Sequence, residues 1–246
     1  MRYLDCSPRT QQEKRERPME NDQRNARIFG VLFLLTFVTS IPALALFQPV
    51  LDDPAAYIAG GGKDSQIYLG VLLELLLIIA NVATAVVVYP ILRRQNEILS
   101  LGYVAARLVE CMFIAAGIIF VLGIVSLRQD DPGASALAVS FAALKDWTFL
   151  LGPGFIVGWG NGLILGYLMY SSRLVPRGMS MLGLIGGPLI ILSGIGVLLD
   201  VWDSGGAVQA LATIPEFLWE LSLGIYCTVK GFRRDAPILS RTESTS

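Results

Sequence analysis

Long apolar runs separated by short polar segments dominate the chain from residue 28 onward. A helix that crosses a membrane needs about 20 mostly apolar residues, and continuous runs are typical of such helices rather than of alternating β-barrel strands. Six segments meet this requirement, so the pattern predicts an all-α, polytopic membrane protein built as a bundle of six transmembrane helices. The predicted spans are residues 28–47, 67–92, 101–127, 147–170, 179–201 and 213–232.

The segment before the first span has a different composition. Residues 1–26 mix basic and acidic side chains and hold too few apolar residues to fold alone, so we expect a disordered, charged cytoplasmic leader. Met19 opens "MENDQRNARIFG" directly before the first span, which makes residues 1–18 a candidate for a mis-assigned start. Residues 27–233 then form the transmembrane domain, and residues 234–246 form a cytoplasmic tail.

Lysine and arginine are distributed unevenly between the two sides of the predicted bundle. The leader, the connections after the second and fourth spans, and the C-terminal end hold most of them, whereas the other side holds Lys63, Arg128 and Lys145. Because cytoplasmic loops are enriched in these residues, we expect a multi-pass protein of the cell membrane with both termini cytoplasmic. This assignment places Lys145 in an outer connection, with Asp146 capping a helix that begins at Trp147.

Composition excludes several classes of chemistry. The chain has 54% hydrophobic and 16% charged residues, against roughly 25% charged residues in soluble domains, and its net charge of −1 gives no reason to expect nucleic acid as a partner. It has no histidine, which excludes Ser-His-Asp catalysis and the common histidine metal sites. The cysteines Cys6, Cys111 and Cys227 form no CxxC pair. We therefore assign no catalytic residue, no metal ligand and no cofactor.

Glycines in the fourth and fifth spans recur at helical spacing. One stripe in the fourth span repeats every four residues, a spacing that keeps small residues on one helix face and allows another helix to approach closely. The fifth span repeats the pattern and then meets Pro188, which removes a backbone hydrogen bond and is expected to kink the helix. The predicted packing glycines are Gly154, Gly158, Gly162, Gly166, Gly183 and Gly187.

Ionisable residues inside the spans are the most informative feature of the sequence. Arg107 and Glu110 lie three residues apart, and hence on one face of the third span. Counting residues from the outer end brings Asn81 of the second span to their level, and places Glu74 and Glu220 together at a shallower one. One arginine then faces three glutamates, so the surplus carboxyl groups must be protonated, hydrated or paired with a partner that the pattern does not identify.

This polar cluster has two interpretations. It can be an ion-pair and hydrogen-bond network that fixes how the helices pack. It can instead be a binding or proton site within a polar cavity, since ionisable residues within membrane spans often mark transport pathways.

Several short stretches resemble a known family. They are "RNARIFGVLFLLTFV", "AARLVE", "KDWTFLLGPGF", "GNGLILGYLMYSSRLVPR" and "PEFLWELSLGIYCTVKGF", and their order along residues 25–232 also agrees. The chain resembles the DUF4386 family of bacterial and archaeal membrane proteins, whose function is uncharacterised. The resemblance implies a prokaryotic membrane domain of several helices and supplies no substrate or reaction.

Two functions remain open from the sequence. The first is a small transporter, or a membrane protein that binds an ion or proton, for which the buried carboxylates, Asn81 and the interrupted fifth span are suitable. The alternative is a non-catalytic membrane subunit whose helices contact a partner protein or a second copy of the chain as a homo-oligomer. The lipid bilayer is the expected partner in both cases, and nothing in the sequence favours an enzyme.

Overall fold

The computed structural model describes residues 8–131 and 133–240, and within those ranges the chain forms helices and no strand. Residues 1–7 and 241–246, at the ends of the predicted leader and tail, lie outside the described part. The helices are α1 (Pro8–Asp52), α2 (Pro54–Ile58), α3 (Asp64–Leu92), α4 (Glu97–Asp130), α5 (Ser135–Leu151), α6 (Gly166–Ser172), α7 (Arg177–Leu198), α8 (Ala207–Lys230) and α9 (Pro237–Ser240). Two π-helical segments, η1 (Gly152–Ile156) and η2 (Gly158–Leu165), join α5 to α6.

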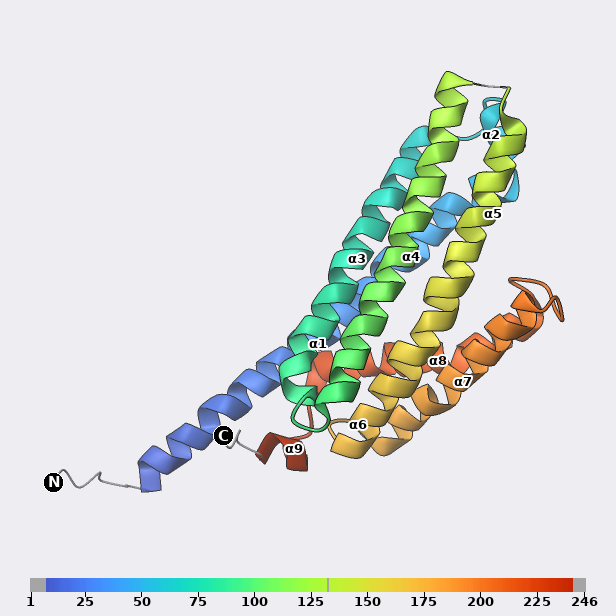
Figure 1. Ribbon diagram of the computed structural model, residues 1–246. Helices are drawn as coiled ribbons and strands as arrows, with labels where there is room; N and C mark the ends of the chain where they lie inside the picture. Colours follow the sequence, from blue (N-terminus) through green and yellow to red (C-terminus); the bar gives the residue numbers. More distant parts are fainter. Residues whose placement is uncertain (1–7, 132, 241–246) are drawn as a thin grey trace.

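The long helices form one bundle with two parts. The helices α3, α4 and α5 stand beside one another, while α7 and α8 form an antiparallel pair that leans away from them (Figure 1). Helix α1 crosses behind the bundle and packs against both α3 and α8. Helix α9 and the beginning of α1 lie at the same end of the bundle as the α3–α4 and α6–α7 connections (Figure 1).

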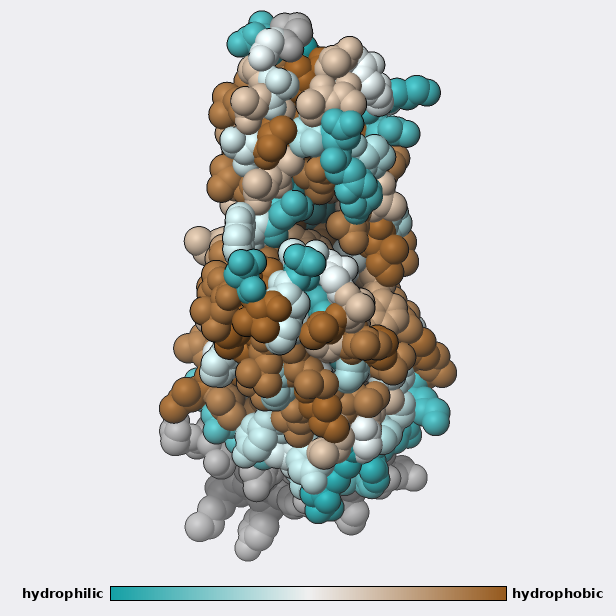
Figure 2. Space-filling model, turned by 90° about the vertical axis from the view of Figure 1, so that its right-hand side faces the viewer, coloured by the Kyte–Doolittle hydropathy of each residue, from teal (hydrophilic) through white to brown (hydrophobic). Residues whose placement is uncertain are grey.

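Apolar surface identifies the protein as a membrane-embedded one. Five helical segments of the described chain are long and apolar enough to span a membrane: Met19–Asp52, Asp64–Leu92, Glu97–Asp130, Ser135–Ser172 and Arg177–Leu198. Their outward faces carry many large apolar side chains, which water would disfavour and lipid accommodates. Examples on α3 are Leu69, Leu72, Leu76 and Ile79. Figure 2 shows hydrophobic residues gathered over one broad zone of the surface, with hydrophilic residues towards its ends.

The predicted sixth span, residues 213–232, overlaps α8 up to Lys230, and α8 is not among these five segments. Helix α8 has the length to cross a bilayer, about 36 Å at 1.5 Å per residue. Two glutamates, Glu216 and Glu220, lie inside it. The described helices thus support five spans by length and composition, and the sixth depends on what compensates these two acids.

Two helix beginnings differ from the sequence prediction. Residues 8–26, predicted as a disordered leader, are helical and continue into the first span as part of α1. In this region Asp22 accepts hydrogen bonds from Arg94 at 2.7 and 3.1 Å, and Gln23 donates to the carbonyl of Phe232 at 2.8 Å. These contacts join α1 to the connection after α3 and to the segment after α8, and they hold the polar residues around Asp22 in place.

The fourth span also begins earlier than predicted. Helix α5 starts at Ser135 instead of Trp147, because the apolar residues of "SALAVSFAAL" continue the helix upstream. Lys145, predicted in an outer connection, is therefore buried inside the bundle, and Asp146 lies within α5 and does not cap it. The described connection between α4 and α5 is correspondingly short.

The glycine-rich segment following α5 is not a regular α-helix. Residues 152–156 and 158–165 form wider π-helical turns, which are uncommon and occur frequently at functional sites. A side chain added at Gly158 would place its Cβ 2.7 Å from the carbonyl oxygen of Gly187, and one at Gly162 would collide with the Gly187 backbone. A Cβ added at Gly166 would lie 3.3 Å from the amide nitrogen of Leu184, whereas one added at Gly154 would meet only Phe149 and Leu150 of the preceding helix α5. The close contact between η2 and α7 thus depends on Gly158, Gly162 and Gly187. Gly183 lies against Trp219 of α8, and α7 continues through Pro188.

We expect Gly162→Ala to lower the melting temperature of the purified protein in detergent, because the methyl group separates η2 from α7. Gly178→Ala is the matched control, since Gly178 is also helical and a methyl group added there would have no atom within 4 Å. That change should be neutral or should stabilise by up to about 1 kcal/mol through helix propensity. Equal melting temperatures for the two variants would contradict the packing role.

Candidate functional site

Arg107 lies at the centre of a closed polar triad between α3 and α4. Its guanidinium is 2.8 Å from Glu110 Oε2 and also donates to the Asn81 side-chain oxygen. The Asn81 amide donates to Glu110 Oε1 at 3.1 Å, and the Arg107 guanidinium also lies 5.6 Å from the Phe33 ring centroid. All three polar side chains are buried. The triad is therefore balanced in charge, and its side chains hydrogen-bond one another, although the buried Arg107 Nε has no hydrogen-bond partner in the described chain.

A second buried pair joins α3 to α5. Lys145 Nζ lies 2.6 and 2.9 Å from the two oxygens of Glu74, and 5.0 Å from the Phe47 ring centroid. Gly117 of α4 makes room for it, because a methyl group there would come within 2.9 Å of the lysine ammonium. Lys145 is thus the cation that the sequence pattern did not identify, and it neutralises Glu74.

A third polar group lies where η2, α7 and α8 meet. The Asn161 side-chain amide donates to Glu220 Oε1, and the Trp219 indole donates to the Asn161 carbonyl at 3.0 Å. Glu220 is partly buried and interacts electrostatically with Arg107 and Glu110 across the bundle. The π-helical geometry of η2 is what presents the Asn161 side chain and carbonyl to the same helix, α8.

Glu216 lies one helical turn before Glu220 and is not identified by the sequence pattern. Its side chain is buried, with the whole residue 2% exposed, and its two carboxylate oxygens have no hydrogen-bond partner in the described chain. A methyl group at Gly162 or at Gly186 would lie 2.8 Å from Glu216 Oε2. The residue therefore projects into the contact between η2 and α7. The i, i+4 spacing of the two glutamates in "PEFLWEL" is the signal that could have found it.

The structure divides the cluster that the sequence predicted. Arg107, Glu110 and Asn81 come together, and Glu74 belongs to a separate pair with Lys145. Glu220 lies with Asn161 and Glu216 instead of at the level of Glu74. Four glutamates and two cations occupy the interior of the described bundle, so the two glutamates of α8 remain without an ion-pair partner there.

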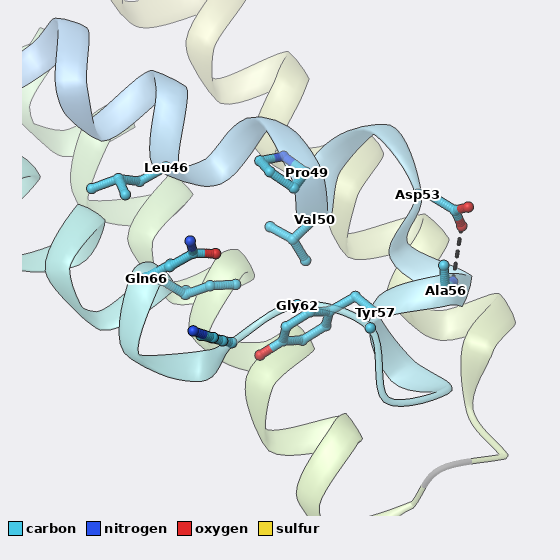
Figure 3. Close-up of a pocket in the computed structure, with 11 residues that line it drawn as sticks. Leu46, Pro49, Val50, Asp53, Ala56, Tyr57, Gly62 and Gln66 are labelled. Carbon is cyan, nitrogen blue, oxygen red and sulfur yellow. Dashed lines mark hydrogen bonds between the residues drawn. The ribbon is translucent and has the colours of Figure 1, made fainter.

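A recess of about 120 Å³ lies at the opposite end of the bundle from the two chain ends, between α1, α2 and α3. In Figure 3, Pro49 and Val50 of α1 face Tyr57 and Gln66 around it, while the Asp53 carboxylate accepts a hydrogen bond from Ala56 N at 2.9 Å. Its walls are mostly apolar, and no group of convergent charges from the described residues points into it. We assign it no binding role.

Beside this recess, polar contacts connect α2, α3 and α4. The Tyr57 hydroxyl donates to Asp64 at 2.5 Å, and Arg128 lies 2.9 Å from the same carboxylate and 4.5 Å from the Tyr57 ring centroid. Burial, together with the neighbouring Asp64 carboxylate, raises the pKa of Tyr57 to about 12. The tyrosine therefore stays a hydrogen-bond donor throughout the physiological range, which suits a structural contact.

In the described part of the chain, no three side chains of the histidine, cysteine, aspartate and glutamate types gather as a metal site would require. The interior sites are those of a helical membrane protein with buried ion pairs and two surplus acids. Residues 28–231 match the family model described as "Domain of unknown function (DUF4386)", and the chain belongs to that family. No curated protein and no solved structure matches the chain.

The Arg107–Glu110 pair is testable by a double-mutant cycle. Removing one partner leaves an uncompensated buried charge, which typically costs about 3–5 kcal/mol, whereas replacing both with apolar residues is often neutral. We expect Glu110→Gln to destabilise more than Arg107→Met, since Glu110 can take up a proton while arginine stays charged. The double variant Arg107→Met, Glu110→Leu should recover much of the loss in thermal melts. Additive losses would show that the two residues do not interact.

Proposed function

We propose that this protein is a small membrane transporter, or an ion-binding membrane protein, that binds and moves a proton or a small cation at the glutamates of α8. The observation that carries this proposal is the charge balance of the interior. The triad and the Glu74–Lys145 pair are each neutral, whereas Glu216 and Glu220 have no cation of their own among the described residues. Uncompensated acids inside a membrane bundle are expensive and typically belong to ion or proton pathways.

The surroundings of these acids support the same function. The η2 segment interrupts regular α-helical geometry directly beside Glu220, and irregular helices line the binding sites of many transporters. The contacts of η2 with α7 and α8 depend on glycines, so small movements of these segments need no large side chain to be displaced. The balanced pairs on α3, α4 and α5 provide a fixed frame on which this part of the bundle rests.

The proposal includes a topology of six spans with both ends cytoplasmic. Helix α8 has the length of a span, and its outward face carries apolar side chains such as Leu211, Ile214, Leu218 and Ile225. Its acids point inward, so lipid would meet only its apolar face. Both described ends share one end of the bundle with the arginine-bearing α3–α4 and α6–α7 connections, as the positive-inside rule requires of a cytoplasmic side (Figure 1).

Single cysteines introduced in a Cys6→Ser background test this topology in intact cells. We expect Asp130→Cys to react with a membrane-impermeant maleimide added outside, because the α4–α5 connection faces outward. Arg173→Cys should react only after the membrane is permeabilised. Cys111 and Cys227 are buried and should give little background. Labelling of Arg173→Cys from outside would show that the orientation is the opposite of the one proposed.

Flux through purified protein in lipid vesicles tests the function. With a pH-sensitive dye inside and an imposed proton or sodium gradient, the wild type should change the internal pH faster than protein-free vesicles. We expect Glu220→Gln to reduce the rate to that of protein-free vesicles, because the amide cannot exchange a proton and holds a cation weakly.

The matched control removes a balanced pair from the same interior. Glu74→Leu with Lys145→Met deletes two charges without changing the net charge, so the flux should persist if the variant folds. A wild type that moves no ion under any gradient would reject the transport proposal and leave the partner-subunit role as the better explanation. Loss of flux in the control alone would place the pathway at Glu74 instead.

A further inference from the structure

Glu216 differs from the paired buried acids of the described chain. Asp22, Glu74 and Glu110 each have a cation within 2.9 Å, whereas neither oxygen of Glu216 has a cation or a hydrogen-bond donor among the described residues. An isolated carboxylate in an apolar environment costs far more free energy than the neutral acid, and proteins avoid that cost by protonating the group. The surroundings of Glu216 therefore determine whether its carboxyl group is protonated.

Backbone atoms confine the carboxyl group of Glu216. A Cβ added at Gly162 of η2 or at Gly186 of α7 would lie 2.8 Å from Glu216 Oε2, so the backbones of both segments pass close to the carboxyl group. The Gly186 backbone also meets the backbone of Glu216 itself, since a methyl group there would lie 2.5 Å from its amide nitrogen. Such close packing leaves little room to hydrate an anion, and it favours a compact, uncharged group.

No cation from the packed helices, as far as they are described, reaches Glu216. Helix α8 packs mainly against α1, α7 and η2. Between Arg27 and Asp52, α1 has no charged residue; α7 has only Arg177, at its first position; and η2 has none. The charged group that acts on Glu216 is Glu220, one turn away on the same helix. A second carboxylate makes ionisation of Glu216 still less favourable.

Several hydrogen-bond acceptors at this place also have no donor in the described chain. The side-chain oxygen of Asn161 has no donor in the described chain, and neither do the two oxygens of Glu216. Two donors at this place are already used, because the Asn161 amide donates to Glu220 and the Trp219 indole donates to the Asn161 carbonyl. A proton on a carboxyl group converts one acceptor into a donor and thereby reduces the imbalance.

We propose that Glu216 binds a proton at neutral pH, as a buried carboxylic acid, and exchanges it through the partly exposed Glu220. This inference rests on the proposed function and names the ion and the residue that holds it. The transfer moves one proton between two carboxyl groups on one helix face and needs no other reactant. Ionisation of Glu216 would require water or a cation to enter the contact between η2 and α7. Loss of the proton would therefore loosen the packing of these two segments.

Infrared difference spectroscopy on the protein in lipid tests the protonation state directly. A carboxylic acid and a carboxylate absorb in separate bands, so the wild-type spectrum minus that of Glu216→Gln should contain an acid band at neutral pH. Glu74→Gln is the matched control, and its difference spectrum should contain a carboxylate band, because Lys145 Nζ lies 2.6 and 2.9 Å from the two Glu74 oxygens. Glu216→Met serves as a second variant if the glutamine variant fails to fold.

The outcome separates this inference from the proposed function. Loss of a carboxylate band in Glu216→Gln or Glu216→Met would overturn the inference, because it would show that Glu216 is ionised in the folded protein. This holds whether water or a metal cation stabilises the carboxylate. An acid band in a protein that moves no ion would support the proton site and reject transport. Proton flux that survives in Glu216→Gln would show that Glu216 is not the exchanging group, even if transport itself is established.

Discussion

Every ionised group placed inside a lipid-surrounded helix bundle requires a compensating charge or a proton, and the architecture of this protein follows from that requirement. On α3, α4 and α5 the requirement is met by pairing. Arg107, Glu110 and Asn81 close into one network, and Lys145 reaches Glu74 across a glycine. Breaking either pair would leave a charge in a low-dielectric environment, so the pairs fix the relative position of these three helices.

The α7–α8 part of the bundle satisfies the requirement differently. Glycines and two π-helical segments replace ion pairs as the basis of packing, and two acids lie among them without a cation from the described chain. The protein thus combines a frame held by balanced charges with a closely packed region that contains two acids and, among the described residues, no cation paired with them. The proton that we propose at Glu216 would neutralise one of these two acids and needs almost no additional space.

Much of this arrangement follows from the sequence, and the exceptions have physical causes. Continuous apolar runs locate α3, α4 and α7, and the three-residue spacing of Arg107 and Glu110 places them on one helix face. The pattern misplaces Lys145 because a lysine beside Asp146 resembles a loop, while the preceding alanine-rich run is only moderately apolar. In the sequence, the excess of glutamates over cations within the spans is the feature that indicates a further buried cation such as Lys145.

Glu216 escapes recognition in the sequence for a related reason. It follows Pro215, which suggests the first turn of a helix near the membrane surface, yet α8 begins at Ala207 and buries Glu216 well inside. The π-helical turns that bring Asn161 to Glu220 cannot be predicted either, because hydrophobic periodicity does not distinguish π-helical from α-helical turns within a short glycine-rich segment. Tertiary contacts decide both features, and local pattern contains little information about them.

The central claim is that Glu216 carries a proton in the folded protein at neutral pH. Counting the protons released on unfolding tests it most directly, since an acid that is neutral only in the folded state must ionise when the chain is exposed to water at neutral pH. In a weakly buffered detergent solution, the wild type should release one proton more per chain than Glu216→Gln when denaturant is added. Equal release by the two proteins would contradict the claim.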